Sequence, residues 1–395
     1  MSNFMLFIVV VLVVVAIAQL SRVYELGRTL KKHREEEISE ANNKLNANLW
    51  IVFMFAFYGF FIYLTVAYWD KMLPESASLH GETIDSLMNL NLVLVTLVFF
   101  VVNTLMFWFC FKYYKKPGQK AVFFPHDNKL ELFWTIVPTV VLAVVIITGL
   151  VAWNDITDEA SPEAINIELY SKQFDWTARY GGEDNTLGSA SFNFISGTNP
   201  LGLVTKESIT LKLAEIDEQI AANADRLENE VMSDEVEKAL EVSQRRLYAQ
   251  RARINAYDVE SANIISGYDD KLVKAEFHIP VGKEVKFVFR SQDVIHSAYM
   301  PHFRAQMNTV PGMVTTFKFV PTITTDSMRV ITGNENFNYA LLCNKICGSA
   351  HYNMKMDIIV ESEEDYNAWL NGQKTFAEAY GIADKEEGIA ENLNN

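Results

Sequence analysis

The chain has 395 residues, half of them apolar, and carries 34 basic against 49 acidic side chains for a net charge of −15. This composition excludes a disordered chain, a collagen-like fibre and a small disulfide-stapled protein, and the acidic balance excludes a basic nucleic-acid-binding protein. Residues 1–152 hold 12 basic and 11 acidic side chains, whereas residues 153–395 hold 22 and 38. The sequence therefore predicts a membrane half followed by an acidic aqueous half.

Apolar runs in the first half predict membrane-spanning helices. Three runs are long enough to cross a bilayer, at about residues 49–69, 92–111 and 132–153. A fourth, at about residues 4–20, is shorter and has two interpretations: a retained helix, or a cleavable signal peptide, since its Ala-Ile-Ala ending resembles a cleavage site. Because no Lys or Arg precedes it, we expect a retained helix and a transmembrane region over residues 1–155.

Loop charges predict the orientation of these helices. The loops at residues 19–48 and 112–131 hold six and five basic side chains, whereas the loop at residues 70–91 holds one basic side chain and four acidic ones. Basic loops stay in the cytoplasm. We therefore expect the N-terminus and everything after Trp153 to lie outside the cytoplasm.

Glu131 stands at the predicted cytoplasmic start of the last helix, in the run Glu-Leu-Phe-Trp-Thr-Ile-Val-Pro that ends at Pro138. Its carboxylate has two interpretations. It could simply mark the membrane edge, or it could admit protons to a relay, since acids beside a helical bundle are costly and often functional. The residue alone favours the first interpretation.

Short alternating runs of β-branched and aromatic residues predict strands in the second half. Turn residues separate these runs, so we expect an antiparallel sandwich or barrel over residues 156–365, followed by an acidic tail over residues 366–395. The predicted strands are residues 165–170, 174–180, 275–279, 284–289, 315–320, 328–332 and 356–360.

One stretch interrupts the strand pattern. Residues 206–257 contain no Gly or Pro, and their apolar residues recur at helical spacing on both sides of Ser233-Asp234. This pattern predicts a helical hairpin inserted into the β domain, with Ser233-Asp234 capping the second helix. The apolar seam is explained by two helices that bury each other; a docking arm for a partner subunit is the alternative.

The strongest chemical signal is the spacing C-x3-C-x3-H-x2-M, formed by Cys343, Cys347, His351 and Met354. Thiolate, imidazole and thioether are soft ligands, and together they suit copper used for electron transfer. His296, in the upstream run Asp-Val-Ile-His-Ser, can supply a second imidazole. Two thiolates, two imidazoles, the Met and one backbone carbonyl could hold two copper ions bridged by both sulfurs.

Other interpretations of this cluster explain fewer of its residues. A structural zinc site accepts Cys and His but seldom includes a regularly spaced Met. A disulfide between Cys343 and Cys347 is compatible with an extracytoplasmic domain but leaves His351 and Met354 unexplained. A membrane-anchored copper metallochaperone also uses C-x3-C with His, yet it needs one helix and has no use for the Met. Copper electron transfer accounts for most of the pattern.

These motifs, with Gln173-Phe-Asp-Trp176, resemble subunit II of the haem–copper cytochrome c oxidases. The resemblance covers about residues 92–195 and 265–365. It implies a membrane-anchored α+β chain, in which transmembrane helices precede a cupredoxin-like Greek-key β-barrel, here with an inserted helical hairpin. The implied function is to accept electrons from cytochrome c and pass them to haem in subunit I, where O2 is reduced to water with proton translocation.

The resemblance also implies the roles of particular residues. Cys343 and Cys347 would be bridging thiolates of a binuclear copper A centre, His296 and His351 imidazole ligands, Met354 an axial ligand, and the carbonyl of Lys345 the other. Glu131 falls on the family's glutamate at the entrance of a proton pathway. The resemblance therefore favours proton entry over a carboxylate that only marks the membrane edge. Trp176 and Phe174 lie in the aromatic run associated with electron transfer.

The implied surroundings follow from the same resemblance. Expected partners are subunit I, which holds the haems, subunit III, membrane lipid, and either cytochrome c or a cytochrome c domain of a neighbouring respiratory complex. No nucleic acid is expected. The expected location is a bacterial inner membrane, with several spans and the copper domain on the periplasmic side.

The sequence also departs from the family pattern. The family usually has a glutamate where Lys345 stands, and its carboxylate contributes to a magnesium site; a lysine there puts that site in doubt. Phe174 occupies the position where many members have the tryptophan that receives electrons. The first two predicted helices and the hairpin at residues 206–257 are additions to the usual pattern of two helices and one barrel.

Overall fold

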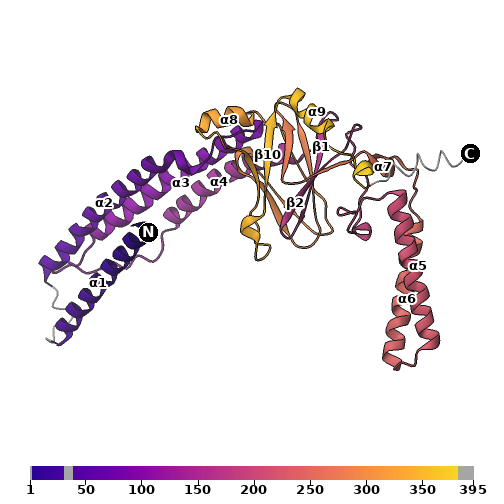
Figure 1. The fold of residues 1–395 in the computed structure, drawn as a ribbon. Helices are drawn as coiled ribbons and strands as arrows, with labels where there is room; N and C mark the ends of the chain where they lie inside the picture. The colour runs from indigo at the N-terminus through magenta and orange to yellow at the C-terminus, as the bar shows by residue number, and fades with distance from the viewer. Residues whose placement is uncertain (1, 31–38, 381–395) are drawn as a thin grey trace, which may run out of the picture. The chain divides into compact units, whose positions relative to one another are not determined.

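The computed structural model describes residues 2–30 and 39–380 and divides into two compact units (Figure 1). One unit comprises Met1–Leu73 with Leu90–Val140, and the other comprises Pro74–Asn89 with Val141–Asn395. The last part of the predicted acidic tail, residues 381–395, lies outside the described residues.

The N-terminal part of the chain forms long helices. They are α1 (Ser2–Leu30), α2 (Glu40–Met72), α3 (Leu79–Lys112) and α4 (Asn128–Thr157). Among the described residues, α2, α3 and α4 are long and apolar enough to cross a membrane. All four helices are longer than the predicted apolar runs, because polar residues at their ends are also helical. At the start of α2, the Ser39 hydroxyl accepts a hydrogen bond from the Asn42 N–H and caps the helix.

Helices α2 and α3 pack through aromatic side chains. The rings of Trp50 and Phe53 on α2 lie 5.9 and 5.7 Å from that of Phe107 on α3, which is buried. Farther along the same pair, the hydroxyl groups of Tyr58 and Thr104 lie 2.9 Å apart. Aromatic contacts of this kind stabilise the pair beyond the area they bury.

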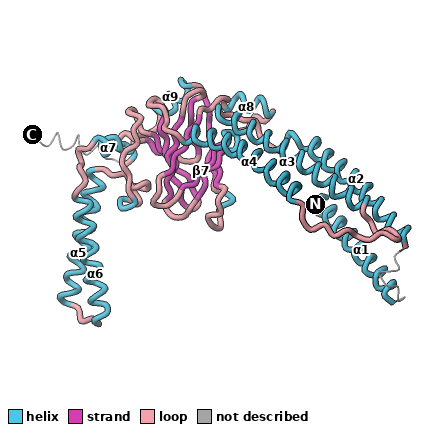
Figure 2. The backbone as a smooth tube through the Cα atoms, turned by 180° about the vertical axis from the view of Figure 1, so that it is seen from behind, coloured by secondary structure: helices cyan, strands magenta, loops and turns pink. Residues whose placement is uncertain are grey.

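The second half of the chain contains a sandwich of two five-stranded sheets with a cupredoxin-like fold (Figure 2). One sheet has the order β3-β2-β1-β5-β8 and the other β4-β10-β9-β6-β7. Their bounds are β1 Ile165–Lys172, β2 Asp175–Tyr180, β3 Lys271–Val273, β4 Glu276–Pro280, β5 Val285–Ser291, β6 His296–Met300, β7 Ala305–Thr309, β8 Thr315–Phe319, β9 Tyr339–Cys343 and β10 Lys355–Glu361.

The expectation of purely antiparallel sheets is wrong. Strands β1 and β5 pair in parallel, as do β4 and β10, while the other neighbours are antiparallel. Parallel neighbours need a long connection, and the intervening chain supplies it in both cases. The alternating pattern of the sequence identifies a half-buried strand, but it contains no information on the direction of that strand's neighbour.

The strand predicted at residues 328–332 is also wrong, because α8 (Thr325–Thr332) is a helix. The Thr324 hydroxyl accepts a hydrogen bond from the Ser327 N–H at its start, and Gly333 ends it in the left-handed conformation at φ 63°. Met328 is buried in the core, whereas Val330 and Ile331 are exposed. The β-branched residues favoured a strand in the sequence pattern, but the caps at Thr324 and Gly333 stabilise a helix.

The predicted hairpin consists of α5 (Lys206–Asn229) and α6 (Asp234–Asn255). Ile216 on α5 and Leu240 on α6 are buried. Ser243 is a polar residue at a position of α6 where the helical spacing would place an apolar one, and the Asn223 side chain on α5 donates a hydrogen bond to its hydroxyl. The described residues also form three further α-helices, α7 (Ala262–Ile265), α9 (Glu363–Asn371) and α10 (Phe376–Ala379), and four short 3-10 helices.

Buried charges stabilise the first sheet. Arg179 on β2 donates hydrogen bonds to Glu168 on β1 and to Asp270, which precedes β3, and all three side chains are buried. Burial opposes ionisation of Glu168, but Arg179 and Arg290 hold the pKa of that carboxyl below its ordinary value. Removing one partner of such a group leaves an uncompensated buried charge.

We expect Arg179→Leu to destabilise the sandwich by about 3–5 kcal/mol, because Glu168 and Asp270 would lose their shared cation. The measurement is the thermal transition of the full chain, followed by near-ultraviolet circular dichroism. Arg226→Leu is the control, since its pair with Glu230 is half exposed and contributes about 0–1 kcal/mol. Equal shifts for both variants would contradict the assignment.

Candidate metal centre

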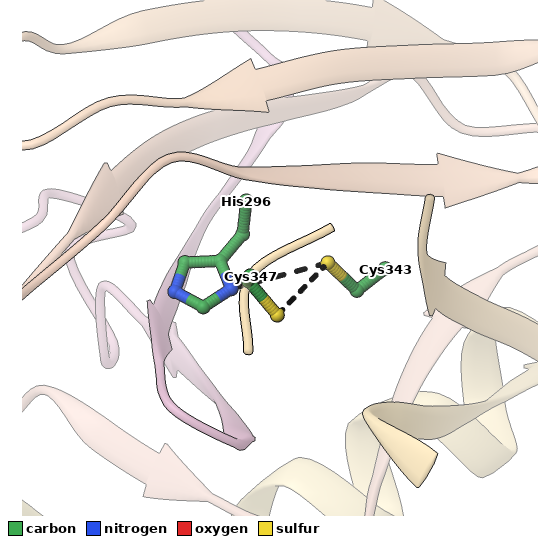
Figure 3. Close-up of side chains that lie close together, drawn as sticks. All are labelled: His296, Cys343 and Cys347. Atoms are coloured by element: carbon green, nitrogen blue, oxygen red, sulfur yellow. Dashed lines mark hydrogen bonds between the residues drawn. The ribbon is translucent and has the colours of Figure 1, made fainter. Parts of the chain in front are cut away.

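One cluster brings together ligand-type side chains: His296 from the start of β6, Cys343 from the end of β9 and Cys347 from the loop between β9 and β10 (Figure 3). The turn between β1 and β2 and the segment between β5 and β6 lie beside this cluster. Strand β6 pairs with β9 so that Ala298 lies opposite Cys343. This register brings His296, at the start of β6, next to the cysteine at the end of β9.

The two thiols and one imidazole form the centre of the cluster. The Cys343 and Cys347 sulfurs lie 3.8 Å apart, and the Cys343 sulfur lies 3.9 Å from Nδ1 of His296. One ligand atom from each of these three residues lies within 4.8 Å of the others. All three residues are buried and both cysteines are free.

The other residues singled out by the spacing surround the same two sulfurs. His351 Nδ1 lies 3.5 Å and Met354 Sδ 3.9 Å from the Cys347 sulfur. The Cys343 thiol lies 3.2 Å from the carbonyl oxygen of Lys345. A short 3-10 turn, His351–Asn353, directs the end of the loop back toward the sulfurs.

The chemistry of the donor set fits copper. Two sulfur atoms that can both bridge, two Nδ1 atoms, a thioether and a carbonyl are neighbours in this structure, and soft ligands of these types select copper. Burial, together with Cys343, raises the pKa of the Cys347 thiol to about 11. A bound metal cation would lower the pKa of the thiols and favour the thiolate forms.

Asp293 and Gln173 also belong to the site, although the sequence reasoning gave them no role. Asp293 Oδ1 lies 2.9 Å from His296 Nε2, and Oδ2 accepts a hydrogen bond of 2.7 Å from the Gln173 N–H. Burial opposes ionisation of Asp293, but these hydrogen bonds hold its pKa below the ordinary value. The only sign of this role in the sequence is that Asp293 stands three residues before His296.

Gly348, next to Cys347, makes a close approach to Phe174. Its φ of 146° favours glycine, and a Cβ there would lie 2.7 Å from the Phe174 ring. The amide side chain of Gln173 donates a hydrogen bond to the Cys347 carbonyl oxygen. The turn between β1 and β2 therefore fixes the backbone of the cysteine loop.

Of the remaining predicted residues, Trp176 lies near the cluster and Glu131 lies in the other compact unit. Trp176 is buried and its ring centroid lies 6.3 Å from that of His296. Glu131 is not part of the cluster; it lies in the first turn of α4, where the Asp127 carboxylate caps the helix and His126 Nδ1 lies 3.8 Å from Oε1 of Glu131.

Two family descriptions match the chain. Residues 66–151 match the transmembrane domain of cytochrome c oxidase subunit II, and residues 241–363 match its periplasmic domain. The matches identify a membrane protein with a transmembrane domain and an extracytoplasmic domain of this class.

Relatives of known identity support the same class. The chain is 30% identical over 295 residues to the alternative cytochrome c oxidase subunit 2 of Bradyrhizobium diazoefficiens, covering 74% of this chain and 81% of the relative. It is 25% identical over 322 residues to cytochrome c oxidase subunit 2 of Thermostichus vulcanus, covering 80% and 82%. The chain belongs to the family of cytochrome c oxidase subunit II.

A weaker likeness is to the crystal structure of the periplasmic domain of subunit II of cytochrome oxidase from Bradyrhizobium japonicum. It covers 54% of this chain and 94% of that domain, with 15% identity and a TM-score of 0.26.

We expect Gly348→Ala to destabilise the chain by on the order of 1–3 kcal/mol, because the new Cβ would meet the Phe174 ring. The loss of stability is measured from the thermal unfolding transition of the full chain. Gly282→Ala is the matched control, since Gly282 also has a positive φ, 76°, but open space around it. If the clash matters, Gly348→Ala is the more damaging of the two, and adding Phe174→Ala recovers part of the loss.

Proposed function

We propose that the chain is the electron-accepting subunit of a respiratory cytochrome c oxidase in a bacterial inner membrane, with its β domain on the periplasmic side. It would receive electrons from cytochrome c, or from a cytochrome c domain of a neighbouring complex. It would pass them to haem in subunit I for reduction of O2 to water, coupled to proton translocation. Subunit III would be a further partner. Membership of the subunit II family supports the proposal.

One observation carries the proposal: two cysteine sulfurs and four further donor atoms of types found at copper sites lie together. We assign bridging thiolates to Cys343 and Cys347, with the imidazoles of His296 and His351, the Met354 thioether and the Lys345 carbonyl as the other ligands. When bound, a binuclear copper pair would supply a one-electron redox couple at this position.

The chain's own residues would hold these ligands in place and keep water away from them. His296 Nε2 faces the Asp293 carboxylate, so the imidazole would carry its proton on Nε2 and offer the Nδ1 lone pair toward Cys343. The rigid sandwich allows little movement of the buried ligands, which favours fast electron transfer. Phe174 and Trp176 are aromatic neighbours of the ligand loops and would lie close to the path of the electron.

A magnesium site of the family type is not part of the proposal. The ligating carboxylate of the family is replaced by Lys345, and an ammonium group offers no lone pair to a cation. The backbone carbonyl of the same residue keeps its place beside Cys343.

We expect the purified full chain in detergent to bind two copper ions and to show a near-infrared mixed-valence band. Cys347→Ser should abolish that band, because a hydroxyl is a poor bridge between soft ions. Cys110→Ser is the control and should leave the band unchanged, since Cys110 lies on α3 and is exposed. Metal analysis and absorption spectroscopy provide both readouts.

A single, readily exchanged copper ion in the wild-type chain would instead favour a membrane-anchored copper metallochaperone. Zinc, or no metal after reconstitution, would remove the basis of the electron-transfer proposal. Retention of the band in Cys347→Ser would refute the ligand assignment.

Glu131 is proposed as the entrance of a proton pathway into subunit I. We expect Glu131→Gln to slow oxygen consumption by the assembled oxidase while leaving the near-infrared band intact, because the amide cannot take up and release a proton. Glu82→Gln, an exposed carboxylate in the first turn of α3, is the control. A rate of oxygen consumption in Glu131→Gln equal to that of the wild type would contradict the role.

A further inference from the structure

Two side chains outside the proposed ligand set connect the loops that carry the ligands. Asp293 contacts the imidazole of His296 through one oxygen and the backbone N–H of Gln173 through the other. The side chain of Gln173 then donates to the carbonyl oxygen of Cys347. A continuous hydrogen-bonded chain therefore runs from one proposed ligand to another through residues of two other connections.

We propose that Asp293 and Gln173 act as a single positioning unit that fixes His296 and Cys347 relative to each other and sets the reduction potential of the metal centre. The inference rests on the proposed function, since it concerns a copper pair at this site. It assigns these residues to orientation and tuning; neither binds the metal.

The Asp293 half of the unit acts on the imidazole. A carboxylate that accepts the Nε2 proton fixes the orientation and tautomer of the ring and increases the basicity of Nδ1. Stronger donation from Nδ1 stabilises the oxidised state of a metal. The isosteric change Asp293→Asn removes the negative charge and this polarisation, so it should raise the potential.

The Gln173 half of the unit acts on the cysteine loop. Its amide holds the carbonyl of Cys347, while the adjacent Phe174 ring lies against Gly348, so both sides of the Cys347–Gly348 peptide are constrained. Replacing the amide by a carboxylate removes the donor and adds a negative charge beside the centre. Gln173→Glu should therefore lower the potential, in the opposite direction to Asp293→Asn.

The test compares these variants in the full chain after copper loading. The midpoint potential is measured by redox titration of the near-infrared band. Gln292→Glu is the matched control, because it introduces the same charge next to Asp293 at an exposed side chain for which the described residues show no hydrogen bond. We expect shifts of opposite sign for Asp293→Asn and Gln173→Glu, with a smaller shift for the control.

Gln173→Met provides a second readout that adds no charge. It keeps the side-chain length but removes the donor, and the loss of such an outer partner typically weakens metal binding about 10–100-fold. Competition with a copper chelator measures the change, and the thermal transition of the metal-free chain should stay at the wild-type value.

Several results would overturn the inference while leaving the proposed function intact. One is a wild-type band and potential in both Asp293→Asn and Gln173→Glu. Another is a shift in Gln173→Glu no larger than in Gln292→Glu. A third is loss of folding in Asp293→Asn and Gln173→Met alike, which would make the two residues purely structural. Absence of the band in the wild-type chain would instead refute the proposed function itself.

Discussion

The antiparallel register of β6 with β9 is the constraint on which the site depends. Because Ala298 pairs with Cys343, the start of β6 lies beside the end of β9, and His296 comes within 3.9 Å of the first sulfur across 47 residues of chain. If one strand slipped by one residue, its side chains would turn to the other face of the sheet, and His296 and Cys343 would no longer meet. The backbone hydrogen bonds of the sandwich therefore determine which donors meet, before any metal contributes.

The loop after β9 completes the arrangement by local means. Its short spacing brings the Cys347 sulfur within 3.8 Å of that of Cys343, and His351 and Met354 within 3.9 Å of the Cys347 sulfur. The 3-10 turn at His351–Asn353 lies between the last two ligands. Gly348 makes the close approach to Phe174 possible. Part of the site is thus encoded by residues near one another in the sequence, and part by the sheet.

This division explains what the sequence could predict. The ligand types and the hairpin at residues 206–257 follow from spacing and periodicity, which are local. The helix α8 was missed because the caps at Thr324 and Gly333 outweigh the β-branched composition between them. The parallel neighbours, and the contacts of Asp293 and Gln173, depend on tertiary pairing, which no local pattern contains.

The exposure of the site bears on the kind of donor it suits. His296 is fully buried, whereas Ile346 and Tyr352, each next to a proposed ligand, are 86% and 89% exposed. The two cysteines are buried, at 8% and 6% exposed, although these neighbours lie at the surface. Electrons can reach a buried centre near the surface without atoms moving to it, whereas a substrate that binds the ligands would have to reach them. This geometry fits a protein partner that delivers electrons across its contact surface, as the proposed function requires.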